Sequence, residues 1–464
     1  MTRANWIQQW EAYIGRRAVE HRVPGIAVGM AAQGEPAYLQ GFGWRDRERG
    51  LPVTPETVFG IASITKSFTG VAIMQLQEQG ILSVHDPVVR YLPAFRTPDP
   101  AQTKAITLHH LLSHTAGLPP LPGMQACTRD QLLADPRFAT QTEALRKLPQ
   151  VDTPEQFLDF MAGLDYQLLG APGEYFSYSN DGYVLLGLVI AAVSGVDYPT
   201  YIQRQILEPA GMARSTLAGN DLLNGWENVT QLYVRDGAEA APAPGWAAHP
   251  FASAAGMLKS TTTDMLRYAE LFRTGGLVDG TRLLRPESVQ AMTAPAITLG
   301  PDVHYGYGLM VQRFRGTTLV HHGGTYKGVK SLMVIAPEAG LTGITLINLM
   351  DAPATDIMMA GVSAFLGHGA DPTQFTLEEV AISREALAEY AHTYPSDMGP
   401  VTFRLGESGL EVESRLTGVL PLRYVGNDTF LVAFTGTDET VTFYRNREGQ
   451  IDKVLFHLRL MRKG

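Results

Sequence analysis

Cysteine is nearly absent from this sequence: Cys127 stands alone among 464 residues, so the chain cannot form an internal disulfide. We expect a surface or half-buried thiol, because Cys127 lies in a Pro-rich polar segment. Long apolar runs are missing too. No stretch approaches the roughly 18 uninterrupted apolar residues that a membrane-spanning helix needs, so we expect no membrane span.

An excess of positive charge is also lacking. Lys and Arg number 37 against 46 Asp and Glu, which gives a net charge of −9, and there is no long basic run. We therefore do not expect nucleic acid or an anionic membrane as the main partner, because both are bound by clustered cations. A small-molecule or peptide substrate suits this composition better.

Residues 1–23 lack the unbroken apolar segment and the small-residue cleavage site of a secretory leader, so a cytoplasmic location is expected. Apolar residues recur there at helical spacing, which predicts an amphipathic helix. Apolar residues make up 45% of the whole chain and charged residues 18%, the balance of a globular protein. The length exceeds a usual single core, so we expect a large domain over 1–370 and a smaller one over 375–464.

The apolar patterns predict an α+β fold, with an antiparallel sheet flanked by helices and a small C-terminal all-β barrel or sandwich. Expected helices cover 1–23, 64–80, a segment ending at 272, and 377–394. Expected strands cover 25–31, 37–43, 309–313, 318–322, 331–336 and 342–349, then 401–405, 410–413, 422–425, 429–434, 440–445 and 453–458. Residues 119–154 are expected to be an irregular or partly helical insertion that roofs a cleft, and 238–249 to be loop.

The stretch around Ser63 is the first candidate catalytic centre. Ser63 and Lys66 lie three residues apart where an apolar run becomes helical, so both side chains share one helix face. A serine hydroxyl becomes nucleophilic when a base takes its proton, and a neutral lysine one turn away can do so. The spacing predicts a nucleophile, although the same two residues also fit a solvated helix face.

A second candidate lies in a turn rich in hydroxyls and amides, just before a strongly apolar helix. Tyr178 and Asn180 in this turn can direct a phenol and an amide into a pocket. The alternative is an ordinary turn with a helix cap at Ser179 or Asn180.

A third candidate is the run His322, Gly323, Gly324 and Thr325, which ends a predicted strand. Glycines at a strand end let a ligand approach the backbone closely. Acyl transfer needs donors for a developing oxyanion, and the backbone N–H groups of Ser63 and Thr325 are candidates for that task.

Two other chemistries fit less well. His110 and His114 fall one helical turn apart, but a zinc peptidase helix carries a glutamate directly after the first histidine, where Leu111 stands. We expect a packed helix end there, and neither a metal nor a cofactor in the protein. The segment that begins at Gly60 is similar to a phosphate loop, but it has Thr65 where that loop needs glycine, which disfavours an NTP-binding protein.

The three candidates stand in chain order and have matching phrases around them. These phrases are Thr57-Val58-Phe59, the run from His110 to Leu118, and Pro172-Gly173. Together they resemble the penicillin-binding-protein and serine β-lactamase superfamily, in the branch of class C β-lactamases, D-alanyl-D-alanine carboxypeptidases and CubicO-type hydrolases. The resemblance covers about residues 5–370, and residues 375–464 resemble a lipocalin-like β-domain appended to some of these hydrolases.

The resemblance implies that Ser63 is the acylated nucleophile and Lys66 a proton relay. It implies that Tyr178 is the partner base and leaving-group acid, and that Asn180 binds substrate and orients Lys66. His322 stands where penicilloyl enzymes carry the lysine of Lys-Thr-Gly, a departure shared with esterase- and peptidase-like members. The acylation base, Lys66 or Tyr178, stays open.

The implied function is a serine hydrolase that cleaves a peptide, a D-amino-acid amide or a carboxylic ester, with weak β-lactamase activity. The alternative is a catalytically slow sensor that binds β-lactams or peptidoglycan fragments. The C-terminal domain is expected to cap the cleft or to mediate self-association into a homo-oligomer.

Overall fold

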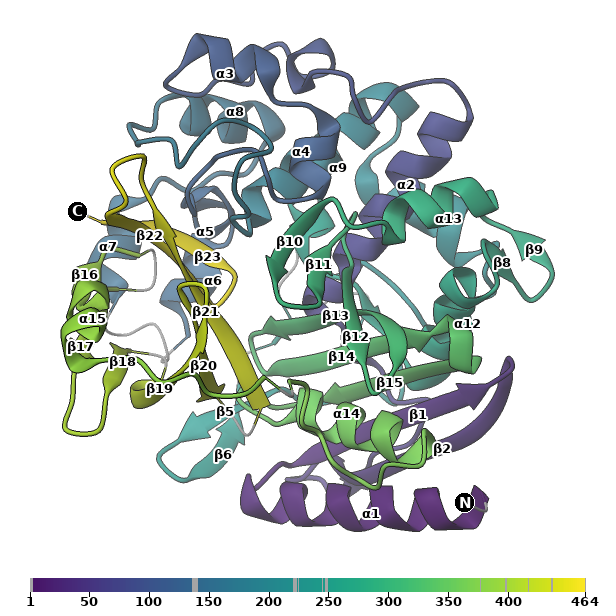
Figure 1. The fold of residues 1–464 in the computed structure, drawn as a ribbon. Coiled ribbons are helices and arrows are strands. Elements are labelled where there is room, and N and C mark those ends of the chain that lie inside the picture. The colour runs from purple at the N-terminus through teal and green to yellow at the C-terminus, as the bar shows by residue number, and fades with distance from the viewer. Residues whose placement is uncertain are drawn as a thin grey trace.

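A nine-stranded antiparallel sheet forms the centre of the computed structural model (Figure 1), in the order β10-β11-β12-β13-β14-β15-β1-β2-β3. Its strands are β1 (Gly25–Ala32), β2 (Glu35–Asp46), β3 (Leu51–Pro52), β10 (Ile297–Gly300), β11 (Val303–Tyr305), β12 (Met310–Phe314), β13 (Thr317–Tyr326), β14 (Val329–Ala336) and β15 (Leu341–Ile347). The structure describes residues 3–135, 141–219, 223, 225–243, 245–246, 249–375, 377–396, 399–415, 417–434 and 437–463.

Strand β1 is buried on both faces because helices cover the sheet from two sides. Ile26 and Val28 point to a core shared with α1 (Arg3–Glu20) and α14 (Ala354–Phe365). Ala27, on the other face, joins the core that contains α2 (Thr65–Glu78) and α12 (Thr262–Arg273), as the two-residue period of a strand requires. The N-terminal hairpin thus joins a sheet whose strands β10 to β15 come from much later in the chain, since Ile26 pairs with Ile347.

The other helices of the first 370 residues lie towards one end of this sheet, several of them around α2 (Figure 1). They are α3 (Pro100–Ala105), α4 (Leu108–Leu112), α5 (Gly123–Cys127), α6 (Arg129–Leu133), α7 (Thr142–Lys147), α8 (Pro154–Ala162), α9 (Asn180–Ser194), α10 (Tyr198–Ile202) and α13 (Pro286–Thr293). Two-stranded pairs are β4 (Phe59–Gly60) with β7 (Lys259–Ser260), β5 (Tyr233–Asp236) with β6 (Glu239–Pro242), and β8 (Leu277–Val278) with β9 (Thr281–Arg282).

The C-terminal part is an eight-stranded sheet in simple sequence order, curled into a nearly closed barrel. Its strands are β16 (His392–Tyr394), β17 (Val401–Leu405), β18 (Leu410–Ser414), β19 (Gly418–Gly426), β20 (Thr429–Phe434), β21 (Thr437–Arg445), β22 (Ile451–Phe456) and β23 (Arg459–Arg462). Aromatic side chains such as Tyr394, Phe403 and Phe443 fill its core. The α+β prediction is therefore confirmed, while the domain boundary between 370 and 375 stays a prediction.

One predicted helix is wrong. Residues 377–394 were expected to be helical, but only α15 (Arg384–Leu387) and a short 3-10 turn (Ala388–Tyr390) are, and His392–Tyr394 pairs with β17 as strand β16. Backbone pairing with the barrel overrides the local helical spacing there. The sequence also left out β23, whose residues pair with β22.

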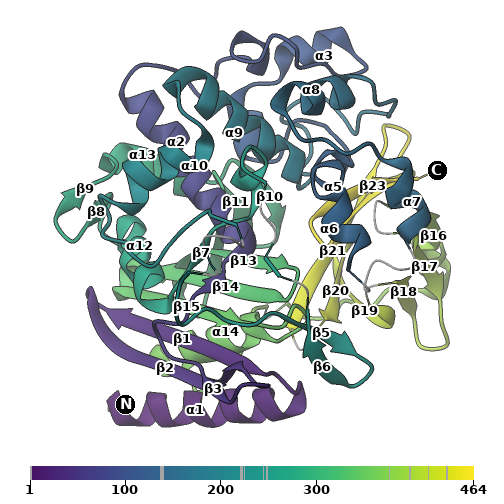
Figure 2. The same cartoon turned by 180° about the vertical axis from the view of Figure 1, so that it is seen from behind.

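Two smaller expectations change as well. Cys127 is buried, not half-exposed, because α5 packs it into the main core, and burial raises the pKa of its thiol to about 12. The expected loop 238–249 contains strand β6, which pairs with β5, while residues 244, 247 and 248 lie outside the described part. Residues 119–154 are partly helical as predicted, and both views place α5, α6 and α7 beside the barrel (Figures 1 and 2).

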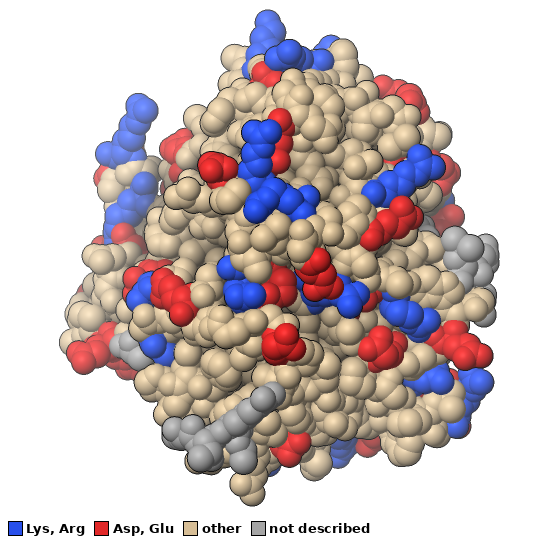
Figure 3. Space-filling view, turned by 90° about the vertical axis from the view of Figure 1, so that its right-hand side faces the viewer, with Lys and Arg blue, Asp and Glu red and all other residues tan. Residues whose placement is uncertain are grey.

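Charges of both signs are mixed on the face shown in Figure 3, where Lys and Arg lie among Asp and Glu without a large patch of one sign. Among the described residues no single helix is long and apolar enough to cross a bilayer. Asn180–Ser194 and Tyr198–Leu207 pass such a test only jointly, as a pair bent by 76°.

Candidate active site

Ser63 lies in a short 3-10 turn, Ala62–Ile64, that leads directly into α2. Two contacts fix this turn: the N–H of Ile61 donates to the carbonyl of Leu258 over 3.0 Å, and Thr65 Oγ1 donates to the carbonyl of Ala62 over 2.6 Å. Ala62 has a φ of 46°, a left-handed conformation that costs a residue with a side chain free energy. Strained backbone of this kind tends to occur at functional sites, where surrounding contacts hold it.

Lys66 projects from the first turn of α2 towards Ser63, as the spacing predicts. Its Nζ lies 3.3 Å from Ser63 Oγ and donates to Asn180 Oδ1 over 2.9 Å and to the carbonyl of Ala255 over 2.5 Å. The side chain is fully buried. Burial lowers the pKa of Lys66 well below its ordinary 10.5, the charge of Arg459 lowers it further, and Asp181 opposes the change.

Tyr178 lies across Lys66 at the approach to α9, with Lys66 Nζ 4.8 Å from the ring centroid. Ser179 caps α9, because its Oγ accepts from the N–H of Gly182, and this fixes Tyr178 and Asn180 on either side of the cap. Burial raises the pKa of Tyr178, while its hydrogen bond with Ser63 and the charge of Arg459 act in the opposite direction. The phenol is thus protonated near neutral pH.

His322 is a neutral imidazole in this structure. Its Nδ1 lies 2.6 Å from the carbonyl of Gly323 and can only donate to it, so Nε2 accepts from the hydroxyl of Tyr305 at 3.1 Å. Burial, followed by the charge of Lys66, lowers the pKa of His322 to about 3. The site therefore carries no cation where penicilloyl enzymes have their lysine.

The run from His322 to Thr325 was expected to end a strand, and this expectation is wrong. Its glycines lie inside β13, which continues through Thr325 to Tyr326. A Cβ on Gly324 would stand 2.2 Å from the carbonyl oxygen of Ile61, so only glycine lets β13 lie this close to the turn that contains Ser63. Thr325 is exposed at that position, and its role as an oxyanion donor stays a prediction.

His114 was missed as a site residue. It lies beyond the end of α4 in a left-handed conformation with a φ of 58°. His110 and His114 are therefore not one turn apart on a single helix. Its Nδ1 accepts from the N–H of Ser179 over 3.0 Å, and its ring centroid is 4.1 Å from that of Tyr178. His114 therefore supports the tyrosine, and the described residues contain no group of three or more His, Cys, Asp or Glu arranged for a metal ion.

Arg459 was also missed, because it comes from strand β23 of the C-terminal barrel. One guanidinium N–H donates to the carbonyl of Tyr178 over 2.6 Å, and the Cζ lies 5.0 Å from the centroid of the tyrosine ring. The neighbouring Leu458 carbonyl accepts from the N–H of Tyr178 over 2.9 Å. Nothing in the local sequence around Arg459 marks such a contact.

The structure thus unites Ser63, Lys66, Tyr178, Asn180 and His322 from three separate segments of the chain. Buried amine, phenol and imidazole side chains with shifted pKa values surround one half-buried hydroxyl. Such an arrangement can move a proton from the serine to a neighbouring group.

The chain is also similar in sequence to known proteins. Protein flp of Staphylococcus aureus strain MRSA252 is 28% identical over 214 residues, which are 46% of this chain and 39% of that protein. The chain therefore spans about two fifths of the length of the curated relatives it matches first.

Solved structures extend the similarity to the barrel. The octameric penicillin-binding protein homologue from Pyrococcus abyssi matches 98% of this chain and 100% of its own, with a TM-score of 0.70 and 28% identity. EstCE1, a hydrolase with promiscuous acyltransferase activity, matches 75% of this chain and 94% of its own, with a TM-score of 0.60 and 25% identity.

The sequence profile of the Beta-lactamase family matches residues 8–365, a span that holds the nine-stranded sheet and every site residue except Leu458 and Arg459. With the fold, the buried lysine beside its serine and this profile in agreement, the chain belongs to the Beta-lactamase family.

Proposed function

We propose that the chain is a serine hydrolase that forms an acyl-enzyme at Ser63 and cleaves a peptide, a D-amino-acid amide or a carboxylic ester. One observation carries the proposal: a fully buried Lys66 amine lies 3.3 Å from Ser63 Oγ. A neutral amine has two N–H groups and one lone pair. If the two N–H groups donate to Asn180 and Ala255, the lone pair is left to accept the proton of Ser63.

The pKa directions of Lys66 and Tyr178 support one proposed division of the proton transfers between them. Lys66, driven towards its neutral form by burial, takes the Ser63 proton while Oγ bonds to the substrate carbonyl carbon. The carbonyl electrons move to the oxygen, for which the N–H groups of Ser63 and Thr325 are the proposed donors.

The second half of acylation expels the leaving group. Tyr178, held as a phenol by burial, gives its proton to the departing nitrogen or oxygen as the bond to the carbonyl carbon breaks. The Lys66 ammonium then returns a proton to Tyr178. Water attacks the acyl-Ser63 ester in the same manner, releases the acid and restores the serine.

The neutral His322 bears on the substrate class. Penicilloyl enzymes have a cationic lysine at this position, and here the pKa of the imidazole is lowered to about 3, so the group stays uncharged at any physiological pH. We therefore expect esters and amides to react faster than β-lactams.

A hydrolysis panel tests the proposal. p-Nitrophenyl esters, D- and L-aminoacyl p-nitroanilides and nitrocefin would be compared with the wild type and Ser63→Ala. We expect an ester burst in the wild type, with the acyl mass on the peptide that contains Ser63, and none in the variant. Absence of an adduct with every probe would overturn the proposal, whereas an adduct that forms without turnover would indicate the slow, sensor-like alternative.

Self-association is a separate proposal. The Pyrococcus abyssi homologue is described as octameric, and it matches this chain along nearly all of both sequences. Light scattering coupled to size-exclusion chromatography would give the mass in solution. A mass several times 50.6 kDa is expected, and a monomer at micromolar concentration would contradict the proposal.

A further inference from the structure

The hairpin turn between β22 and β23 lies against the active site in an unfavourable backbone conformation. Phe456 pairs with Arg459, so the turn consists of His457 and Leu458 alone. Their φ angles are 47° and 62°, the left-handed pair of a type I′ turn, for which Asn-Gly is the usual sequence. Neither residue is glycine or asparagine, so contacts outside the turn must hold it.

The backbone of Tyr178 provides two of those contacts. Its N–H donates to the carbonyl of Leu458 over 2.9 Å, and its carbonyl accepts from Arg459 over 2.6 Å. Both main-chain groups of the tyrosine are thus bonded to the hairpin, which sets the direction in which its side chain leaves the backbone. His457 is held in turn, because its Nδ1 lies 2.7 Å from a carboxylate oxygen of Glu439 on β21.

Strands β21 and β22 also contact the segment just before the tyrosine. Lys453 of β22 places its Nζ 4.6 Å from the ring centroid of Tyr175, and Tyr444 of β21 meets that ring edge-on at 5.3 Å. Leu455 and Leu460 join Tyr178 and Tyr305 in one buried apolar cluster. The barrel therefore packs directly against the segment that carries Tyr175 and Tyr178.

Arg459 is also a nearby positive charge for the proton carriers. Its charge lowers the pKa of Lys66 and of Tyr178, and of His114 as well. The groups that face Tyr178 are Ser63, Lys66, His114, Tyr183, Tyr305, His322 and Arg459, with Asp181 acting on Lys66 from α9.

We infer that Arg459 is a positioning residue for Tyr178, and that the barrel completes the catalytic site by holding both main-chain groups of the tyrosine. The inference rests on the proposed hydrolase function for its kinetic consequences but not for the contact itself. Loss of the guanidinium should misplace the phenol and remove a charge that favours neutral Lys66.

The kinetic test compares Arg459→Gln and Arg459→Lys with the wild type, on the ester that reacts fastest. We expect Arg459→Gln to lower kcat at least tenfold with KM changed less than threefold, and to move the acid limb of kcat/KM to higher pH. Arg459→Lys keeps the positive charge, so the acid limb of kcat/KM should return to its wild-type pH and kcat should recover in part. Arg462→Gln is the matched control, because Arg462 lies on the same strand, is largely exposed and pairs only loosely with Asp452 at 3.5 Å.

Full activity and an unmoved limb in Arg459→Gln would overturn the inference, and so would a rise in KM alone, which would make Arg459 a substrate contact. Hydrogen–deuterium exchange of the peptide 174–180 adds a readout that needs no activity. Faster exchange in Arg459→Gln, at unchanged exchange elsewhere in the large domain, supports the contact, and unchanged exchange contradicts it. If the wild type forms no adduct at Ser63, the hydrolase proposal fails, and exchange still decides the role of Arg459.

Discussion

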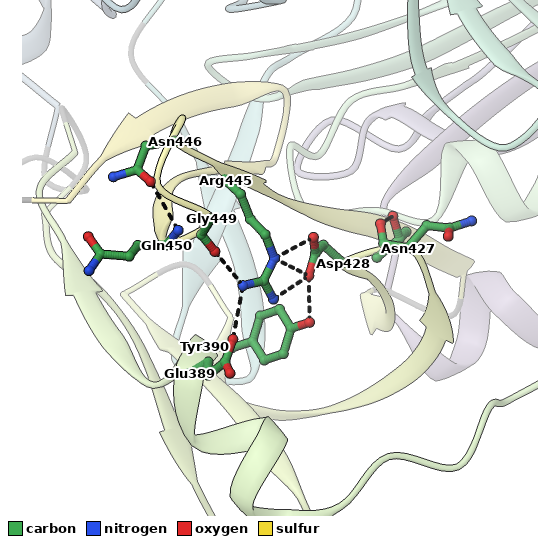
Figure 4. Close-up of polar contacts among 9 residues, drawn as sticks. Glu389, Tyr390, Asn427, Asp428, Arg445, Asn446, Gly449 and Gln450 are labelled. Atoms are coloured by element: carbon green, nitrogen blue, oxygen red, sulfur yellow. Dashed lines mark hydrogen bonds and ion pairs between the residues drawn. The ribbon is translucent and has the colours of Figure 1, made fainter.

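Two basic side chains show how differently this molecule treats an ionisable nitrogen group. Lys66 in the large domain is fully buried and bonds only to neutral oxygens, those of Ser63, Asn180 and Ala255. Arg445 in the barrel is about one-third exposed and is surrounded by carboxylates (Figure 4).

In the barrel, Arg445 is paired with two carboxylates. Arg445 donates to both carboxylate oxygens of Asp428, to Glu389 over 2.9 Å and to the carbonyl of Gly449 over 2.8 Å, and Tyr390 adds a hydrogen bond to Asp428. The bonds to Asp428 and then Glu389 raise the pKa of Arg445, whereas burial lowers that of Lys66. A charge with partners stabilises structure, and a buried amine without a carboxylate partner becomes a base.

Removing the amine should give the largest effect. Lys66→Met has a similar length and no base, so we expect the acylation rate to fall by roughly 10²–10⁴-fold. Burst amplitude and adduct mass at Ser63 measure it. A variant that keeps the wild-type burst would show that Tyr178 alone activates the serine.

Removing only the phenolic hydroxyl should have a smaller effect. Tyr178→Phe keeps the ring between Lys66 and Arg459 but loses the proton donor, so kcat is expected to fall by about 10²-fold for amides. Activated esters, whose leaving groups need no proton, should lose much less. An equal fall in kcat for amides and activated esters would show that Tyr178 is not the acid that protonates the leaving group.

The paired cation should matter for stability instead. Arg445→Gln breaks charge-assisted bonds to Asp428 and Glu389, and we expect the free energy of unfolding to fall by about 1–3 kcal/mol with hydrolysis per folded molecule unchanged. Arg404→Gln is the control, because Arg404 pairs with Glu413 at the surface and should cost less than about 1 kcal/mol. Urea denaturation measures the free energy of unfolding of both variants. An equal loss of stability in the two would show that the Arg445 cluster contributes no more than a surface ion pair.

The pH dependence of stability should show whether the Lys66 amine is neutral in the folded protein. Unfolded Lys66 has its ordinary pKa of 10.5 and folded Lys66 a lower one, so between them the unfolded chain holds the extra proton. Stability due to this group therefore rises with pH, by at most about 1.4 kcal/mol per pH unit. We expect the unfolding free energy of the wild type minus that of Lys66→Met to increase from pH 7 to 9, and a flat difference would mean that folded Lys66 is charged.

Much of the site could be predicted from sequence because its parts are local. Ser63 and Lys66 are set by helix spacing, and Asn180 follows a cap at Ser179 that short-range rules describe well. His322 was found because glycines follow it, although they proved to lie within the strand. Each of these signals sits within a few residues of the group it identifies.

The remainder depends on contacts between distant segments. Arg459 lies 281 residues from its partner Tyr178, and no pattern near it distinguishes it from Arg462 on the same strand. The predicted helix over 377–394 failed for the same reason, since pairing of His392–Tyr394 with β17 decides its end. Local propensity carries no information about which strand another will meet.

The hairpin turn at His457 and Leu458 also sets the order in which the protein can become active during synthesis. A ribosome that has finished Tyr178 must add 281 more residues before Arg459 exists to bind it. The large sheet can close earlier, when β15 reaches β1, but the tyrosine then lacks both of its main-chain partners on the hairpin. A nascent chain therefore carries Ser63 long before Tyr178 beside it is held in place, and the proposed hydrolase activity should be complete only with the last strand of the barrel.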